Sequence, residues 1–336
     1  MADYFPGRVL GIETSCDETS AAVLEGSRVL SNVVSSQAEL HRKWGGIVPE
    51  AAARAHVESI LPVIEEALRV SGTERPSAIA VTNRPGLVGA LSVGLTAGKS
   101  LARSWSLPFA GVHHLEGHVL STLLDGGSPS FPQLCLIVSG GHTETVRVAA
   151  PGDYELLGQT IDDAAGEAFD KGARLLGLGY PGGQAVEKRA EGGDPKRYSL
   201  PRSLRSDPFN FSFSGLKTAV LRLTEKEGDG IDVADAAASL QAAIVDVLSS
   251  KALHAAEHMD ASALTVVGGV AANRSLRARL AEECDKAGIG FFAPEVQYCT
   301  DNAAMIALAG SVRLASGERS DFWLDAQPNA PLPGTA

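Results

Sequence analysis

The sequence contains few cysteines and few aromatic residues. Four cysteines occur in 336 residues and none belongs to a C-x-x-C pair, which excludes a disulfide framework and a cysteine-based zinc site. Cys16 and Cys299 lie in polar motifs and are expected to be small buried thiols. This cysteine usage favours a reducing, cytoplasmic setting, and the first residues lack the charged segment and cleavage site of a secretory signal.

Long apolar runs and an excess of basic residues are also missing. No apolar run approaches the roughly 20 residues that span a bilayer, so no membrane partner is expected. The net charge of −11 excludes an overall basic surface for nucleic acid. A polyanion would therefore have to bind a local basic patch. One candidate patch consists of Lys188, Arg189, Lys196, Arg197, Arg202 and Arg205, and a solvated loop is the alternative interpretation of these residues.

The chain is long enough for two lobes, and strand patterns alternate with helical patterns, which indicates an α/β protein. A strand, a polar turn and a returning strand are predicted over residues 8–24 and again over 134–148. A strand, a glycine-containing loop and a helix are predicted over 78–103 and again over 264–283. The repeated pattern predicts a duplicated fold with two halves facing a cleft.

Two further segments have a simple interpretation. Residues 235–257 are apolar with a helical period and predict a core helix. The Pro-rich residues 327–336 are predicted to be a disordered tail.

The segment His-His-Leu-Glu-Gly-His at residues 113–118 is the most informative motif. His114 and His118 are four residues apart, so a helix would place both imidazoles on one face. Residues 298–302 contain a carboxylate, and together with the two histidines it would form a three-ligand metal site with open coordination positions. The alternative is a pair of histidines that binds no metal. The metallopeptidase motif needs a glutamate directly after the first histidine. Glu116 instead lies about 200° round the helix from His114, so the peptidase base is missing.

Several turns contain residues that suit an anionic or nucleoside ligand. Glycines at residues 139–141 and 268–269 would let backbone N–H groups approach an anion, although neither loop matches a Walker or dinucleotide-binding fingerprint. The adjacent acids Asp17 and Glu18 could hold a divalent cation or position a polar substrate. Turns without any ligand are the alternative in each case.

The segment 162–171 begins with two acids and predicts the start of a helix that carries Asp170. The carboxylate of Asp170 could accept a hydrogen bond from a ribose or an amine. The turn at 180–183 follows, where Gly183 is available against a nucleoside. Ordinary helix and turn chemistry is again the alternative.

Together these motifs resemble the tRNA N6-adenosine threonylcarbamoyltransferase family, bacterial TsaD type, once misnamed O-sialoglycoprotein endopeptidase. The matching segments run in order over nearly the whole chain: GIETSCDET (11–19), GIVPE (46–50), RAH (54–56), PGLVGA (85–90), HHLEGH (113–118), VSGGHT (138–143), DDAAGEAFDK (162–171), YPGG (180–183), FSFSGLKTAV (211–220), GGVAAN (268–273) and CTDN (299–302).

The resemblance implies a duplicated actin/Hsp70/sugar-kinase-like fold with two lobes around a nucleotide cleft. Residues 1–130 and 306–326 would form the N-terminal lobe, with the metal-ligand helix and a partner-binding face. Residues 131–305 would form the C-terminal lobe, which binds the adenylate. The implied activity is transfer of the threonylcarbamoyl group from L-threonylcarbamoyladenylate to N6 of the adenosine 3′ of the anticodon, with release of AMP.

The resemblance also implies roles for individual residues. His114, His118 and Asp301 would hold one divalent metal, Fe²⁺ or Zn²⁺, gripped jointly by both halves. Asp17 and Glu18 match acids that are important for activity in the family. Substrate contacts, with ATP, ADP or the acyl-adenylate bound in the cleft, would come from Val138, Ser139, Gly140, Gly141, His142, Asp170, Gly183, Glu187 and Asn273.

The implied partners are tRNA, a paralogous TsaB-type subunit, a TsaE-type ATPase and a TsaC-type synthase that makes the adenylate. Three rivals stay open from the residues themselves: a zinc metallopeptidase, an ATP-dependent kinase or ATPase on the same duplicated fold, and a non-catalytic nucleotide-binding scaffold.

Overall fold

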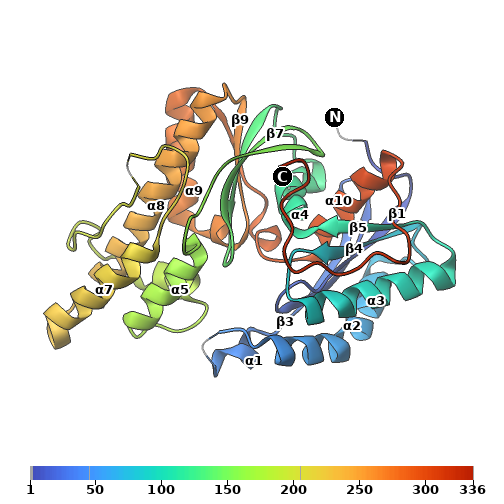
Figure 1. The fold of residues 1–336 in the computed structure, drawn as a ribbon, viewed down its shortest axis with the longest axis horizontal. Helices are drawn as coiled ribbons and strands as arrows, with labels where there is room; N and C mark the ends of the chain where they lie inside the picture. Colours follow the sequence, from blue (N-terminus) through green and yellow to red (C-terminus); the bar gives the residue numbers. More distant parts are fainter. Residues whose placement is uncertain (1–2, 45, 205, 336) are drawn as a thin grey trace. The chain divides into compact units, whose positions relative to one another are not determined.

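The computed structural model describes residues 3–44, 46–204 and 206–335, and its chain divides into two compact units (Figure 1). Unit 1 comprises Met1–Ser128, Ala150–Tyr154 and Thr300–Ala336, and unit 2 comprises Pro129–Ala149 and Glu155–Cys299.

Unit 1 is built on a five-stranded sheet with the order β3-β2-β1-β4-β5. Strands β1 and β2 form an antiparallel hairpin that β3 extends, while β1, β4 and β5 run parallel. The strands are β1 (Arg8–Glu13), β2 (Glu18–Glu25), β3 (Arg28–Ser36), β4 (Ala78–Arg84) and β5 (Phe109–His113).

Helices cover both faces of this sheet. On one face, Leu10 and Ile12 of β1 share a core with Ile60 and Ile64 of α2. On the other face, a Cβ at Gly11 would lie 2.3 Å from a carbonyl oxygen of α10, so glycine is required for this close approach. The helices of unit 1 are α1 (Ala38–Arg42), α2 (Pro49–Ser71), α3 (Val88–Trp105), α4 (His114–Leu120), the 3₁₀ helix η1 (Ser121–Gly126) and α10 (Ala303–Ala315).

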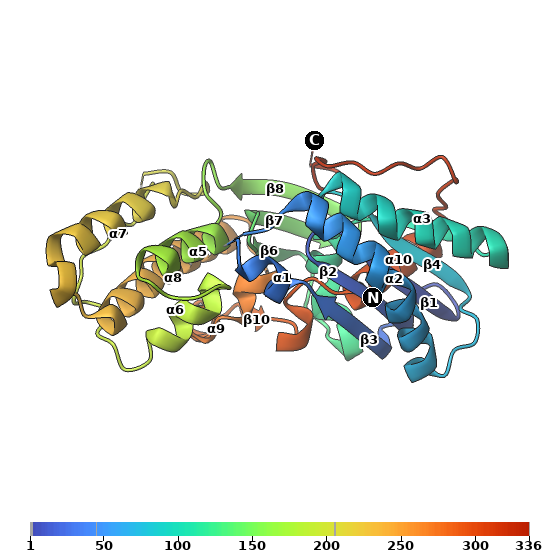
Figure 2. The same ribbon diagram turned by 90° about the horizontal axis from the view of Figure 1, so that it is seen from below.

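Unit 2 repeats the topology of unit 1. Its sheet has the order β10-β9-β6-β7-β8, with an antiparallel β6–β7 hairpin and β9 and β10 parallel to β6 (Figure 2). The strands are β6 (Gln133–Val138), β7 (Thr143–Ala150), β8 (Asp153–Gln159), β9 (Ala263–Val267) and β10 (Gly290–Phe292). The predicted α/β class and the predicted duplication are therefore confirmed.

The helices of unit 2 surround the predicted core helix, which is α8. By length and composition α8 is apolar enough to cross a membrane, but most of its buried side chains belong to the core of unit 2. The helices are α5 (Ala165–Leu175), α6 (Gly182–Arg189), α7 (Ser214–Glu227), η2 (Gly228–Gly230), α8 (Val233–His258), η3 (Gly269–Ala272), α9 (Arg274–Ala287) and η4 (Val296–Tyr298).

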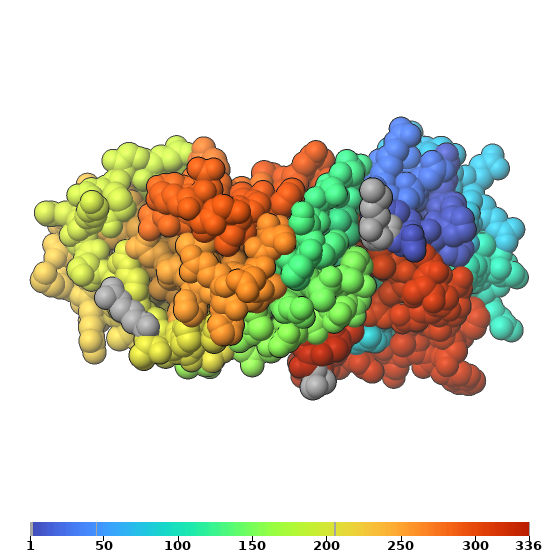
Figure 3. All heavy atoms as spheres, turned by 90° about the horizontal axis from the view of Figure 1, so that it is seen from above, coloured from blue at the N-terminus to red at the C-terminus, as the bar shows by residue number. Residues whose placement is uncertain are grey.

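The two units differ from the expected lobes in several segments. Residues 150–154 and 300–305, expected in the C-terminal lobe, group with unit 1, and residues 129–130 group with unit 2. The Pro-rich tail, predicted to be disordered, is packed on unit 1, where Leu332 is 3% exposed. Helix α10 lies near the N-terminal residues, since Phe5 N donates to the Ser311 carbonyl (3.1 Å), and Figure 3 shows red residues of the C-terminal part of the chain beside blue N-terminal ones.

Candidate metal centre and nucleotide loops

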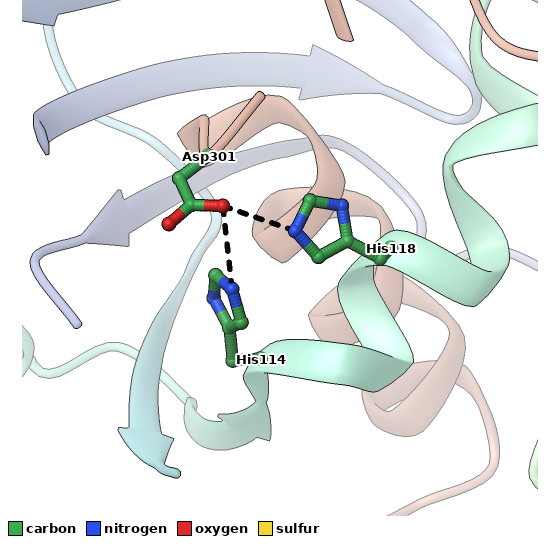
Figure 4. Close-up of side chains that lie close together, drawn as sticks. All are labelled: His114, His118 and Asp301. Atoms are coloured by element: carbon green, nitrogen blue, oxygen red, sulfur yellow. Dashed lines mark hydrogen bonds and ion pairs between the residues drawn. The ribbon is translucent and has the colours of Figure 1, made fainter. Parts of the chain in front are cut away.

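His114, His118 and Asp301 meet in unit 1 and could hold a metal ion. Both histidines lie on α4 and point toward Asp301, which precedes α10 (Figure 4). Asp301 Oδ1 lies 3.1 Å from His118 Nε2 and 3.4 Å from His114 Nε2, and the three possible ligand atoms lie within 4.8 Å of one another. Two imidazole nitrogens and one carboxylate oxygen form a suitable set for Fe²⁺ or Zn²⁺.

The position of Asp301 corrects one expectation. All three side chains belong to unit 1, so the metal ligands do not come from both halves of the molecule. Asp301 is far from the histidines in sequence, but α10 packs against β1 and α4 and so brings the residue before it to the histidine pair. This return of the chain to unit 1 was not visible in the local sequence pattern.

A buried glutamate, Glu13 at the end of β1, orients the first histidine. Glu13 Oε2 lies 3.0 Å from His114 Nδ1 and accepts a hydrogen bond from Thr82 Oγ1 (2.6 Å), while Ser15 N donates to Glu13 Oε1. A carboxylate on the outer nitrogen fixes the ring and leaves Nε2 for a metal. The sequence alone gave no role to Glu13, although an acid at the end of an apolar strand was a usable signal.

The cluster stabilises positive charge. Burial alone would lower the pKa of His114, but the nearby carboxylates of Asp301 and Glu13 raise it well above the usual value. Burial likewise opposes ionisation of Asp301, yet His114 and His118 hold its pKa well below the usual range. A divalent cation in this position would use the same attraction.

The two proposed catalytic acids lie beside this cluster. Glu18 begins β2, and burial together with the charges of Asp301 and Asp17 raises its pKa to about 10. Crowded carboxylates of this kind favour a bound cation, which would relieve their repulsion.

His56 of α2 closes the turn that carries these acids. Its Nδ1 lies 2.8 Å from Thr19 Oγ1 and its Nε2 lies 3.0 Å from the Cys16 carbonyl oxygen. His56 is fully buried, and it belongs to the Arg-Ala-His segment to which sequence analysis gave no role. Burial, with the charge of Asp17, raises the pKa of the Cys16 thiol, which removes it as a thiolate nucleophile.

Glu116 has a structural role. Its carboxylate accepts hydrogen bonds from Arg313 Nε (2.6 Å) and Tyr154 Oη (3.2 Å), and its side chain is 3% exposed. The prediction that it is unsuited to act as a peptidase base agrees with these contacts.

In unit 2, the turn between β6 and β7 is closed by its own hydrogen bonds. Ser139 N donates to the His142 carbonyl (2.8 Å), and Ser139 Oγ accepts from His142 N (3.1 Å) and Gly141 N (3.4 Å). Among the hydrogen bonds of the described residues in this turn, none uses the Gly140 N–H, which could therefore donate to a ligand.

Two other segments pack against this turn. Gly268 has φ +93° and its Cα lies so close to the Val138 carbonyl that a Cβ would be 2.4 Å from the oxygen. Gly166 of α5 donates its N–H to the Ser139 carbonyl (3.1 Å). Helix α5 begins at Ala165, later than predicted, and Asp162 instead accepts hydrogen bonds from the N-terminus of α7.

Three of the remaining predicted substrate residues, Asp170, Asn273 and Glu187, make hydrogen bonds to other residues of unit 2. Asp170 Oδ1 accepts from Gly182 N (2.7 Å), beside Gly183. Asn273 caps α9 through Leu276 N (3.0 Å), and its amide nitrogen donates to Gln241 (2.8 Å). Glu187 Oε1 accepts from Arg274 N (2.8 Å), which ties α6 to the start of α9.

Four glycines of these loops have no structural reason to be glycine. A Cβ at Gly140, Gly141, Gly183 or Gly269 would meet no atom within 4 Å, and none of the four has a positive φ. Glycine at these positions leaves space against the backbone that a ligand could use.

Comparisons with known proteins place this geometry in a family. Residues 28–308 match the family model described as TsaD, tRNA N6-adenosine threonylcarbamoyltransferase. A relative of that name from Anaeromyxobacter dehalogenans (strain 2CP-C) is 53% identical over 96% of this chain and 98% of its own length. Another from Symbiobacterium thermophilum is 52% identical over 99% of both chains.

Solved structures show the fold. Full-length HypF matches with a TM-score of 0.60 at 14% identity, covering 94% of this chain and 47% of HypF. An activator of 2-hydroxyisocaproyl-CoA dehydratase from Clostridium difficile matches with a TM-score of 0.52 at 12% identity, covering 92% of this chain and 95% of the activator. Both have the actin/sugar-kinase-like fold, which is therefore also the fold of this chain. The full-length sequence matches show, in addition, that the chain belongs to the tRNA N6-adenosine threonylcarbamoyltransferase family of transferase enzymes.

Proposed function

We propose that the chain transfers the threonylcarbamoyl group from L-threonylcarbamoyladenylate to N6 of adenosine 37 of tRNA, the residue 3′ of the anticodon, with release of AMP. The tRNAs are those that read codons beginning with A. Family membership supports the reaction class. The single observation that supports these residues as the site is the cluster of two buried histidines, His114 and His118, with Asp301. Acyl transfer accounts for both a metal cluster and glycine loops, whereas a kinase has no evident use for the histidine pair.

The metal proposed for the cluster is Fe²⁺, with Zn²⁺ as the alternative. When bound, such an ion supplies Lewis-acid polarisation of a carbonyl or phosphoryl oxygen. His114, His118 and Asp301 would hold it, and Glu13 would keep His114 Nε2 turned toward it. Asp17 and Glu18 are the proposed catalytic acids beside it.

The adenylate, or ATP or ADP, is proposed to bind the loops of unit 2. Val138, Ser139, Gly140, Gly141 and His142 would contact the phosphate and carbamoyl end, with the Gly140 N–H as the available donor. The adenosine would contact Asp170, Gly183, Glu187 and Asn273. The open glycines support this proposal, and the HypF and activator structures are described as nucleotide-bound and ADPNP-bound.

Transfer is proposed to be direct. Burial raises the pKa of the thiols of Cys16, Cys135 and Cys299, so these cysteines do not supply a thiolate for a covalent intermediate. The exocyclic amine of adenosine is a weak nucleophile, so orientation of the two substrates would supply much of the rate.

Partner contacts are proposed on each unit separately. Val57 and Leu61 lie one turn apart on α2 and are 64% and 60% exposed, which suits an apolar contact with a TsaB-type subunit. Lys188, Arg189, Lys196 and Arg197 are exposed on unit 2 and suit tRNA phosphates. Arg202 is paired with Asp246 (2.7 Å), and Arg205 lies outside the described residues. A TsaE-type ATPase, a TsaC-type synthase and a cytoplasmic location, without a membrane partner, complete the proposal.

A reconstituted reaction tests the function. The chain is incubated with tRNA, threonine, bicarbonate, ATP and the three partner proteins, and the tRNA nucleosides are analysed by mass. We expect threonylcarbamoyladenosine with the unmodified chain and none when the chain is omitted. Modified nucleoside at equal yield without the chain would refute the proposal.

A further inference from the structure

Residues 327–335, here named the C-terminal strap, are held against the loop that follows β4. Gln327 N donates to the Asn83 carbonyl (2.9 Å), and the Pro328 carbonyl accepts from Gly86 N (3.1 Å). Leu332 is 3% exposed, so the strap is anchored by a buried side chain as well. Figure 1 shows the dark red strap running across β4 and β5 and ending beside α4.

The first link from the strap to the metal cluster passes through Gly86 and Ser15. A Cβ at Gly86 would lie 2.5 Å from the Ser15 carbonyl oxygen, and Leu87 N donates to the same oxygen (2.8 Å). Ser15 Oγ in turn lies 3.2 Å from His114 Nδ1. The loop that the strap holds therefore packs directly on the residue beside the first metal ligand.

The second link passes through His113, the fully buried residue that precedes α4. Leu115 N donates to His113 Nδ1 (3.2 Å), so Nδ1 carries no proton and the ring hydrogen is on Nε2. Nε2 lies 3.1 Å from the Ala330 carbonyl oxygen and donates to it. One imidazole thus caps the metal-ligand helix and binds the strap at the same time.

We infer that the strap is a positioning segment for the metal centre, acting through His113 and the Ser15 loop. Fixing the start of α4 and the surroundings of His114 Nδ1 fixes the direction of the Nε2 atoms toward Asp301. Rigid support of ligands by their neighbours raises metal affinity. This inference rests on the proposed metal site and goes beyond it by assigning a role to residues outside every motif of the family resemblance.

Binding of Co²⁺ alone, followed by its visible absorption, tests the inference without any transfer assay. Three changes are compared: a chain ending at Ala326, His113→Asn, and both together. Asparagine keeps an acceptor for Leu115 N but does not reach Ala330. We expect each change to raise the Co²⁺ dissociation constant about 10- to 100-fold, in the range found for residues that support metal ligands. Adding His113→Asn to the shortened chain should change the affinity little further, because the shortened chain has already lost the link through His113.

Two further variants serve as references. His113→Gln places its amide nitrogen near the position of Nε2 and should retain more affinity than His113→Asn. Trp323→Ala changes a side chain that is 92% exposed just before the strap, and it should bind Co²⁺ like the unmodified chain.

The outcomes separate the inference from the proposed function. If the unmodified chain binds Co²⁺ and His113→Asn binds it equally well, the strap has no positioning role, whether or not the shortened chain folds. If the variants only lower the melting temperature of the metal-free protein, the strap is structural and the inference is wrong. If Asp301→Ala binds Co²⁺ as tightly as the unmodified chain, the metal site itself is refuted.

Discussion

The two units share one strand order but use it in different ways. In unit 1 the turn between the hairpin strands ends with Asp17, Glu18 follows as the first residue of β2, and the side chains of His114, His118 and Asp301 lie close together. In unit 2 the corresponding turn is Ser139–His142, where glycines leave backbone exposed. One copy of the topology thus presents charged side chains, and the other presents backbone amides and open space.

Two glutamates near these turns show what the difference does to electrostatics. Burial disfavours ionisation of Glu13, but the charge and hydrogen bonds of His114 outweigh burial and lower its pKa. At Glu144 of β7, burial raises the pKa of the carboxyl to about 7, and no positive charge or hydrogen bond from the described residues lowers it. The same kind of residue on the same kind of hairpin is therefore held ionised in unit 1 and pushed toward neutrality in unit 2.

The largest expected effect comes from removing a metal ligand of unit 1. Asp301→Ala should lower the rate of threonylcarbamoyl transfer about 10³-fold, because several kcal/mol of transition-state stabilisation would be lost. Transfer is measured in the reconstituted reaction and metal content by elemental analysis. Asp229→Ala, on η2 of unit 2, serves as the control and should leave both unchanged. Metal loss with full activity would remove the metal from the mechanism.

Glu13→Gln tests the support of the ligands in unit 1. Loss of the carboxylate behind His114 should raise the dissociation constant for Co²⁺ about 10- to 100-fold. The matched control is Glu25→Gln on β2 of the same sheet, where the side chain is exposed and pairs with Arg8 (3.7 Å). Equal affinities for the two variants would contradict the assigned role of Glu13.

Gly140→Val tests the backbone site of unit 2. A Cβ at this position would have no neighbouring atom within 4 Å, so the fold should persist, but the side chain would occupy the space proposed for a ligand. We expect the affinity for ADP, measured by calorimetry, to fall by about tenfold or more, because roughly one buried hydrogen bond to the ligand would be lost. Gly230→Val, at an equally open position on η2, should bind ADP normally. Co²⁺ affinity should stay unchanged in both, since the metal ligands belong to unit 1.

A pH dependence of stability, without any effect on a ligand, is expected from Glu144. Its pKa is raised in the folded state from 4.5 to about 7, so the folded chain binds this proton more tightly than the unfolded chain. The unmodified protein should therefore lose about 1–3 kcal/mol of stability relative to Glu144→Gln as the pH rises from 4.5 to 7. Urea unfolding at pH 5 and pH 8 measures this, and parallel curves for the two proteins would show that Glu144 is not desolvated.

Local chemistry in the sequence determined much of the fold and part of the site. The hairpins, the glycine loops, the core helix α8 and the shared face of His114 and His118 follow from periodicity and spacing, because these properties act between near neighbours. The identity of the third metal ligand came from the family resemblance, and the geometry that joins it to the histidines is consistent with it.

Only the tertiary structure decided which distant residues meet. The return of α10 to unit 1 brings Asp301 beside the histidines, and the packing of β1 on β4 brings Thr82 to Glu13 behind them. The Pro-rich composition of residues 327–335 indicated disorder, yet their carbonyl groups find donors on Gly86 and His113. The composition of a segment indicates whether that segment can fold by itself. It does not indicate which residues far away in the sequence will bind the segment in the folded protein.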